Sequence, residues 1–128
     1  MGRRTRHMHE LESLIGSAPI PVALEHTGEP RRVPHVVGCG AYRVVRDALS
    51  AARAATEASV AIEFMPGAVA VQVVDDGAGS RDLEGAAEVA AALGGGLRAV
   101  PTRDGFRVRA WLPTEAQPPF PAMRPATP

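Results

Sequence analysis

A run of alternating apolar residues that ends in carboxylates and glycines is the feature that most constrains this chain. Val69, Val71 and Val73 alternate with small or polar residues, which is typical of a half-buried β-strand. Asp75 stands where this strand ends, and the glycines of the segment Asp75–Gly79 permit a tight turn or the close approach of a ligand. A carboxylate here can read the edge of a purine or cap an ordinary glycine turn, and the residues alone favour the turn.

The composition indicates one globular domain with a thin core. The 128 residues are 45% hydrophobic but only 4% aromatic, and the formal net charge is zero. A neutral chain gives no reason to expect nucleic acid or an anionic membrane as a partner. No apolar run approaches the roughly 18 residues of a membrane span, and no apolar segment follows the basic N-terminus as in a signal peptide. We therefore expect a cytoplasmic protein.

The cysteine and the histidines do not suggest a metal site. Cys39 is the single cysteine, so no internal disulfide is possible and no zinc site can form from it alone. It lies in the apolar run 36–41, and we expect it to be a small buried side chain. His26 and His35 have no neighbouring ligands in the sequence, and His7 and His9 lie in a polar segment that we expect to be frayed.

The chain divides into a flexible N-terminus (residues 1–9), a folded domain (10–113) and a Pro-rich, disordered tail (114–128). The order of the patterns within the domain predicts an α+β fold, with helices on one face of a largely antiparallel sheet. The expected elements are a short helix at 10–17, a strand at 21–26, a long helix at 34–56, strands at 59–65 and 69–75, a helix at 83–93, and strands at 97–100 and 106–112.

One face of the last predicted strand is polar. Arg107 and Arg109 alternate there and are more typical of a solvated strand face than of an anion site. Trp111 shares this face, and together with the Pro-rich tail it suggests a partner-binding surface.

Four segments, in this order and spacing, resemble the ATPase domain of sensor histidine kinases of the nitrate-sensor (NarL-partner) type. Ala41–Ala52 resembles the N-box helix, and Val73–Gly79 looks like the G1 box, D-x-G-x-G. Gly85–Gly95 is similar to the family segment that follows the lid, and Gly105–Pro113 to the closing strand. The resemblance covers about residues 10–113. It implies the GHKL ATPase (Bergerat) fold, a two-layer α/β sandwich that binds ATP between helices and sheet.

The resemblance assigns an adenine pocket to Asp75, Gly77 and Gly79, all of which are intact, but the metal and phosphate end departs from the family. The family's Mg²⁺-binding Asn is matched by Ala51, whose methyl group cannot coordinate a hard cation. The family's Glu is matched by Asp47, which retracts the carboxylate by about 1.5 Å.

The phosphate-binding turn of the family is also missing. Only Ser80–Glu84 separate Gly79 from Gly85, without the glycines of that turn, and the charges of Asp82 and Glu84 would repel a triphosphate. Phosphoryl transfer depends on metal, phosphate clamping and positioning, and all three are damaged here.

We therefore expect a degenerate, catalytically inactive regulatory or interaction module in signal transduction. Asp47 is the only candidate catalytic residue, and a solvated carboxylate beside Arg43 and Arg46 explains it equally well. The implied partner is a protein such as a sensor kinase or regulator, or a second copy in a homodimer. The alternative is a domain that binds ATP or ADP without Mg²⁺, in a two-component sensor kinase or an anti-sigma-type serine kinase. In a third interpretation, the pocket binds another small ligand.

Overall fold

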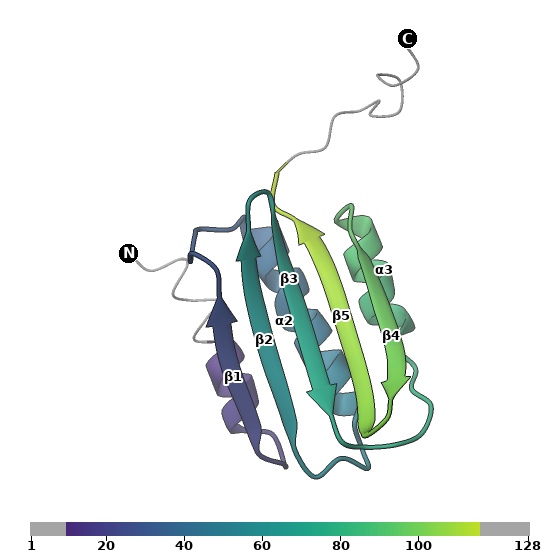
Figure 1. Cartoon of the computed structure of the whole chain (residues 1–128). Coiled ribbons are helices and arrows are strands. Elements are labelled where there is room, and N and C mark those ends of the chain that lie inside the picture. Colours follow the sequence, from purple (N-terminus) through teal and green to yellow (C-terminus); the bar gives the residue numbers. More distant parts are fainter. Residues whose placement is uncertain (1–9, 116–128) are drawn as a thin grey trace.

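The computed structural model describes residues 10–115, which form a five-stranded mixed sheet with helices on one face (Figure 1). This architecture confirms the predicted α+β class. The predicted flexible segment 1–9 and residues 116–128 of the predicted Pro-rich tail lie outside the described residues. No helix within residues 10–115 is long and apolar enough to cross a membrane.

The strands lie in the order β1-β2-β3-β5-β4, so β3 is the central strand of the sheet. Only β1 and β2 pair in parallel, and the other neighbours are antiparallel. A short helix at residues 10–16 precedes the labelled elements, which are β1 (Val22–Thr27), α2 (His35–Ala51), β2 (Ala58–Met65), β3 (Ala68–Asp75), α3 (Glu84–Ala92), β4 (Gly96–Thr102) and β5 (Gly105–Pro113).

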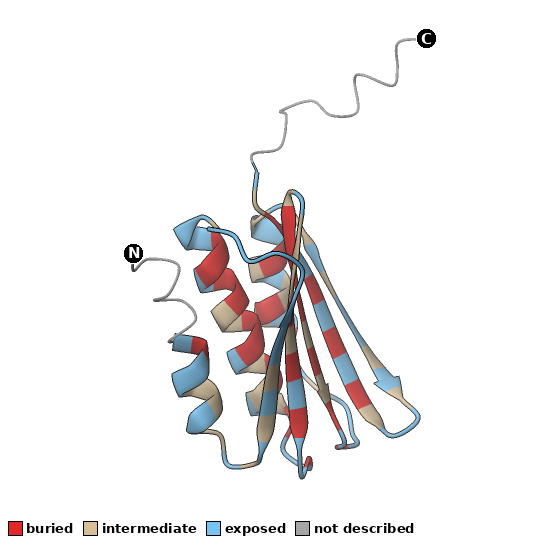
Figure 2. Ribbon diagram, turned by 60° about the vertical axis from the view of Figure 1, so that its left-hand side comes forward, coloured by how far each residue is buried: buried red, intermediate tan, exposed pale blue. Residues whose placement is uncertain are grey.

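The core lies between the helices and one face of the sheet (Figure 2). Val44, Val45 and Ala48 of α2 are almost fully buried against the sheet, where Val71 and Leu112 are fully buried in turn. Most core residues are Val or Ala, as the composition predicts. At Gly40, where α2 packs beside α3, a Cβ would lie only 2.5 Å from Leu93 Cδ1, so the two helices pack closely there.

The structure contradicts our expectation that Cys39 is buried, since this residue is exposed on α2. The buried stripe of the helix passes through Val37, Ala41 and Val44, and Cys39 lies off this stripe. Its Sγ contacts His35 Nε2 at 3.4 Å, one turn earlier on the outer side of the helix. The apolar neighbours in sequence therefore did not indicate burial, because helical periodicity separates neighbouring positions.

Helix α2 ends at Ala51, five residues before the predicted boundary. Ala52 and Ala55 continue the apolar periodicity and are buried, but they lie in the turn that leads into β2. The amides of Thr56 and Glu57 bind the Asp76 carboxylate instead of helical carbonyls. A carboxylate distant in sequence therefore holds the turn that follows the helix, a contact that helix periodicity alone cannot reveal.

Gly105 lets β5 begin directly beside the end of β3. A Cβ at this position would lie 1.9 Å from the backbone oxygen of Asp75 and 2.7 Å from Asp76 Cα. The next residue, Phe106, pairs with Asp75 in the antiparallel register. Any side chain at position 105 would push β5 away from the Asp75 strand end.

We expect Gly105→Ala to destabilise the fold by about 1–3 kcal/mol or more, because the added methyl group overlaps rigid backbone atoms. Gly96→Ala is the matched control: a Cβ there meets no atom within 4 Å, and Gly96 also lies in the β4–β5 pair. Urea unfolding midpoints of both variants test this expectation. Equal midpoints for the two variants would show that β5 adjusts without cost.

Candidate functional site

The predicted purine-binding carboxylate, Asp75, is buried at the end of the central strand. It shares the inward-facing alternation of Val71 and Val73, so its side chain points toward the helical layer. The residue is 5% exposed. A carboxylate at such a position requires partners, because an unpaired buried charge is strongly unfavourable.

One partner is the glycine turn itself. The backbone N–H of Gly77 donates a hydrogen bond to Asp75 Oδ1 at 2.8 Å, which is the geometry of an Asx turn. The structure therefore supports the interpretation that the residues alone favoured, in which Asp75 caps the turn.

The other partner is Arg81, six residues further along the chain. Its guanidinium donates to both carboxylate oxygens, from Nη1 to Oδ2 at 2.7 Å and from Nη2 to Oδ1 at 3.0 Å. Both side chains are only 2% exposed. The Arg81 guanidinium also lies 4.3 Å from the centroid of the Phe106 ring, within cation–π range. Asp75 thus has an internal cation in bidentate geometry, the strong form of such a pair.

Sequence reasoning did not assign a role to Arg81. It is the only cation between Asp75 and Glu84, and the two glycines before it allow the loop to turn back. That combination was the available signal. Its consequence depends on Phe106 of β5, which provides the ring beneath the guanidinium and is distant in sequence.

The two glycines of the motif have structural explanations of their own. A Cβ on Gly77 would lie 2.9 Å from Ala55 N, so this glycine permits close packing against the turn after α2. Gly79 has a φ of 105°, a backbone conformation that favours glycine, with open space around it. The presence of both glycines therefore does not require a ligand.

A cavity of about 490 Å³ lies between the C-terminal part of α2 and the loop before α3. It brings together Asp47 and Ala51 from the predicted metal and phosphate end with Ser80–Asp82 of the short loop. Arg81 lines this cavity and Asp75 does not. The carboxylate of Asp75 therefore does not face this cavity, and the Arg81 side chain, only 2% exposed, lies between them.

Asp47, the candidate catalytic residue, is held in ion pairs. Its Oδ2 accepts from Arg43 Nε at 3.2 Å, and its Oδ1 accepts from Arg46 Nε and Nη2 at 3.3 Å each. The side chain is 22% exposed. Both oxygens are therefore engaged by cations, which matches the interpretation of Asp47 as an ion-paired helix carboxylate.

Asp76 organises the turn that precedes β2. Its Oδ1 accepts from the amides of Thr56 at 2.7 Å and Glu57 at 3.3 Å, and its Oδ2 accepts from the Thr56 hydroxyl. The Thr56 side-chain hydrogen bond, followed by the backbone bond to Thr56, lowers the pKa of Asp76 below its ordinary value of 3.8. Within residues 10–115, no three His, Cys, Asp or Glu side chains are grouped so as to hold a metal ion.

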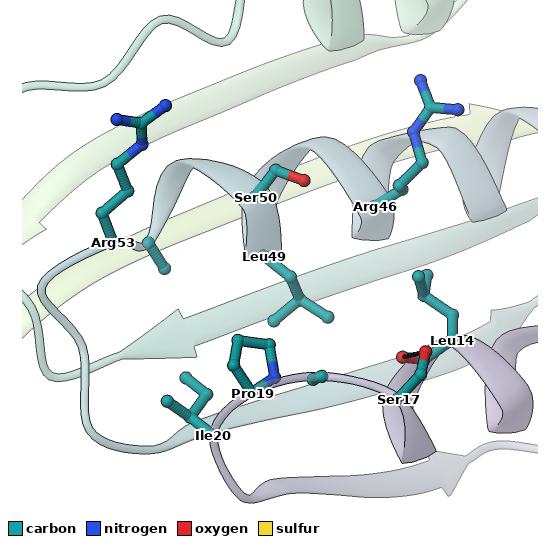
Figure 3. Close-up of a pocket in the computed structure, with 10 residues that line it drawn as sticks. Leu14, Ser17, Pro19, Ile20, Arg46, Leu49, Ser50 and Arg53 are labelled. Carbon is teal, nitrogen blue, oxygen red and sulfur yellow. Dashed lines mark hydrogen bonds between the residues drawn. The ribbon is translucent and has the colours of Figure 1, made fainter.

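A second cavity, of about 540 Å³, lies on the side of α2 that faces the N-terminal segment (Figure 3). Leu49 of α2 points toward Pro19, and Leu14 also lines the cavity, while Arg46 and Arg53 extend from the helix in the opposite direction in this view. Sequence reasoning missed this cavity because its walls come from segments some 30 residues apart.

Neither a protein-family model nor a curated protein sequence matches this chain. Its structure is similar to solved histidine kinases. The similarity to Acinetobacter baumannii histidine kinase AdeS has a TM-score of 0.60 at 11% identity and covers 88% of this chain and 63% of that one. For the blue-light activated histidine kinase of Erythrobacter litoralis EL346, the TM-score is 0.59 at 21% identity, with coverages of 86% and 40%.

The isolated catalytic domain of histidine kinase ThkA is also similar, with a TM-score of 0.60 at 15% identity, over 89% of this chain and 92% of that domain. The chain thus spans less than two thirds of AdeS and of the light-activated kinase, but nearly the whole ThkA domain. It therefore has the fold of histidine kinase ATPase catalytic domains, the GHKL type. Identities this low establish the fold and no more.

We expect removal of Arg81 alone to be strongly destabilising. Arg81→Met leaves the Asp75 carboxylate buried without its cation, which costs about 3–5 kcal/mol for such pairs. The double variant Asp75→Asn/Arg81→Met should recover much of this loss, because no uncompensated charge remains. Chemical unfolding of the two single variants and the double variant gives the coupling energy directly.

The exposed ion pair between Arg109 and Glu63 provides the matched control. Its atoms lie 3.3 Å apart, but the side chains are 46% and 42% exposed. Arg109→Met should change the free energy of unfolding by no more than about 1 kcal/mol. Equal effects of Arg81→Met and Arg109→Met would refute the assignment of Asp75–Arg81 as a buried structural pair.

Asp76 should make the stability depend on acid pH. Its pKa is lowered in the folded state, so its stabilising contribution is present above pH 3.8 and is lost as the pH falls through the lowered value. The native protein should be more stable than Asp76→Asn at pH 7, and the difference should shrink below about pH 4. Urea midpoints of both proteins across this range measure it, and a difference independent of pH would contradict the assignment.

Proposed function

We propose that this chain is a degenerate histidine-kinase-like ATPase domain, of the nitrate-sensor type, that acts through protein contact and not through phosphoryl transfer. The observation that supports this proposal is the bidentate pairing of Arg81 with Asp75. The position that the resemblance assigns to adenine recognition already has an internal cation.

The interaction free energies favour Arg81 over a purine as the partner of Asp75. A purine amine would donate a hydrogen bond to Asp75, and a bond to a charged group contributes about 1.5–3 kcal/mol. To form it, the ligand would displace two charge-assisted bonds and the packing of Arg81 on Phe106. Separating a buried ion pair without a new counter-ion costs about 3–5 kcal/mol, more than the new bond returns.

The residues around the neighbouring cavity support the same conclusion. Ala51 contributes a methyl group where the family places a metal ligand, and Asp47 and Asp82 contribute negative charge where phosphates would lie. The charge of Asp47 is balanced by Arg43 and Arg46, so these cations are already engaged. A Mg²⁺–triphosphate would therefore find no metal ligand at Ala51, and Arg43 and Arg46 are already engaged by Asp47. Within residues 10–115, Arg53 is the one further cation, besides Arg81, that lines the cavity.

A domain with this fold and a closed purine position acts through its surface. In this proposal its partner is a protein such as a sensor kinase or regulator. Binding at such a surface does not require the nucleotide site to open.

The cavity of about 490 Å³ favours a second candidate function, the binding of ATP, ADP or another small ligand. Arg81 lines that cavity, so an outward movement of its side chain would join the cavity to Asp75. In this alternative the chain is a nucleotide-binding domain of a sensor kinase or an anti-sigma-type serine kinase.

Calorimetric titration separates the two candidates. We expect no binding of ATP, ADP or adenosine to the native protein at micromolar concentrations, with or without Mg²⁺, because Arg81 occupies the carboxylate. Ala51→Asn restores the missing metal ligand and should not create ATP binding. Micromolar, Mg²⁺-dependent binding of ATP to the native protein would overturn the proposal.

A second pair of variants identifies the cause. Arg81→Ser should gain weak, metal-independent binding of adenosine, and Asp75→Asn added to it should abolish that gain. Circular dichroism of each variant confirms that it remains folded. If folded Arg81→Ser still binds no adenosine, Arg81 is not what closes the pocket.

A further inference from the structure

The sheet face opposite the helices is uncovered in the described part of the chain. It faces the viewer in Figure 1, in front of α2 and α3. Its charges are unevenly distributed. Glu25 and Glu63 lie on β1 and β2, whereas Arg98, Arg107 and Arg109 lie on β4 and β5. One half of this outer face is therefore acidic and the other half basic.

The strand register places these charges in rows. One row crosses all five strands in the sequence Glu25, Ala61, Gln72, Arg109, Arg98. Arg98 and Arg109 lie directly opposite each other, an unfavourable pairing of like charges. Glu25 and Arg98 are four strand spacings apart, about 19 Å, so they cannot neutralise each other within one chain.

Within residues 10–115, Arg98, Arg107 and Glu25 form no ion pair. Arg109 reaches Glu63 at 3.3 Å, but both groups remain nearly half exposed. The face therefore has unneutralised charge of both signs at its opposite edges.

We propose that this outer face binds a second copy of the chain. A two-fold axis that lies between the two sheets, parallel to the central strand β3, reverses the strand order of the second copy relative to the first. Strand β1 then faces the partner's β4, and β2 faces the partner's β5. Glu25 then lies opposite the Arg98 position of the second copy, twice in each dimer. Two sheets packed in this way are aligned, a common arrangement of sheet on sheet.

Side-chain size supports the same axis. The outward residues of β5 are long or bulky (Arg107, Arg109, Trp111). Arg107 and Arg109 would meet the short residues Ser59 and Ala61 of the partner's β2, whereas Trp111 would lie opposite Glu63. In the central column, on β3, Gln72 and Val74 are partly exposed and Ala70 is buried beneath its neighbours. The long side chains of β5 thus fit the short residues of β2 at two of these three positions.

Trp111 is 45% exposed on the outer face of β5, and such exposure is unusual for so large an apolar side chain.

A sheet face of this size offers a footprint of about 500 Å² on each copy, below the roughly 800 Å² typical of stable complexes. The dimer should therefore be weak and should depend on concentration and salt. This inference does not depend on whether a nucleotide binds.

Charge reversal tests the geometry. Glu25→Arg alone or Arg98→Glu alone places like charges opposite each other twice and should weaken self-association at least about tenfold. An equimolar mixture of the two variants pairs opposite charges at both contacts and should restore a dimer, as should the double variant Glu25→Arg/Arg98→Glu. Sedimentation equilibrium of the full chain over a concentration series measures each case.

The chain offers two controls. Glu88→Arg reverses an exposed charge on α3, in the other layer, and should leave self-association unchanged. Trp111 is the only tryptophan, so its fluorescence should shift to shorter wavelength as the dimer forms. A native protein that stays monomeric at millimolar concentration would overturn the proposal, as would a dimer insensitive to both charge reversals. Binding of an acidic peptide by monomeric protein would assign the face to a different partner.

Discussion

The ion pair between Asp75 and Arg81 connects more of this structure than any other polar contact described above. It joins the end of the central strand, the glycine turn, the short loop before α3 and, through Phe106, the start of β5. Each of these parts needs the others, because the carboxylate requires a cation and the guanidinium requires both a carboxylate and a ring. Arg81 lies only six residues after Asp75, and the glycine turn between them brings its side chain back to the strand end.

This pairing changes how the retained motif is interpreted. Asp75, Gly77 and Gly79 match a nucleotide-binding motif, yet each now has an internal structural role. A carboxylate at this position can be stabilised by a basic residue of the same chain, so the motif alone does not imply a bound ligand. Motif matches in related chains should therefore be checked for a nearby basic residue in the lid segment.

Local signals predicted the fold well, and signals that depend on distant residues were missed. The alternation of Val69, Val71 and Val73 predicted β3, and the alternating polar face of the last strand predicted β5. The predicted end of α2 was five residues too late, because Ala52 and Ala55 continue the apolar periodicity in a turn whose last residues are bound by Asp76. The predicted burial of Cys39 was wrong, because burial on α2 follows the helical periodicity of apolar residues and not the apolar neighbours in sequence. The segment that contains Arg81 was interpreted mainly through the glycines that it lacks. The contacts of Arg81 with Asp75 and Phe106 could be identified only in the structure.

The long connection to the edge strand β1 affects the order in which parts of the domain fold and locally unfold. The β2–β3 and β4–β5 pairs are joined by tight turns, whereas β1 reaches β2 only through residues 28–57, which include α2. Closing that long connection costs more conformational entropy than closing a hairpin, so the contact between β1 and β2 should form more slowly. Most β1 residues are exposed, so the strand adds little to the buried core. The first strand and the helix before it should therefore dock late in folding and exchange their amide hydrogens early, while the strand that ends in Asp75 stays closed.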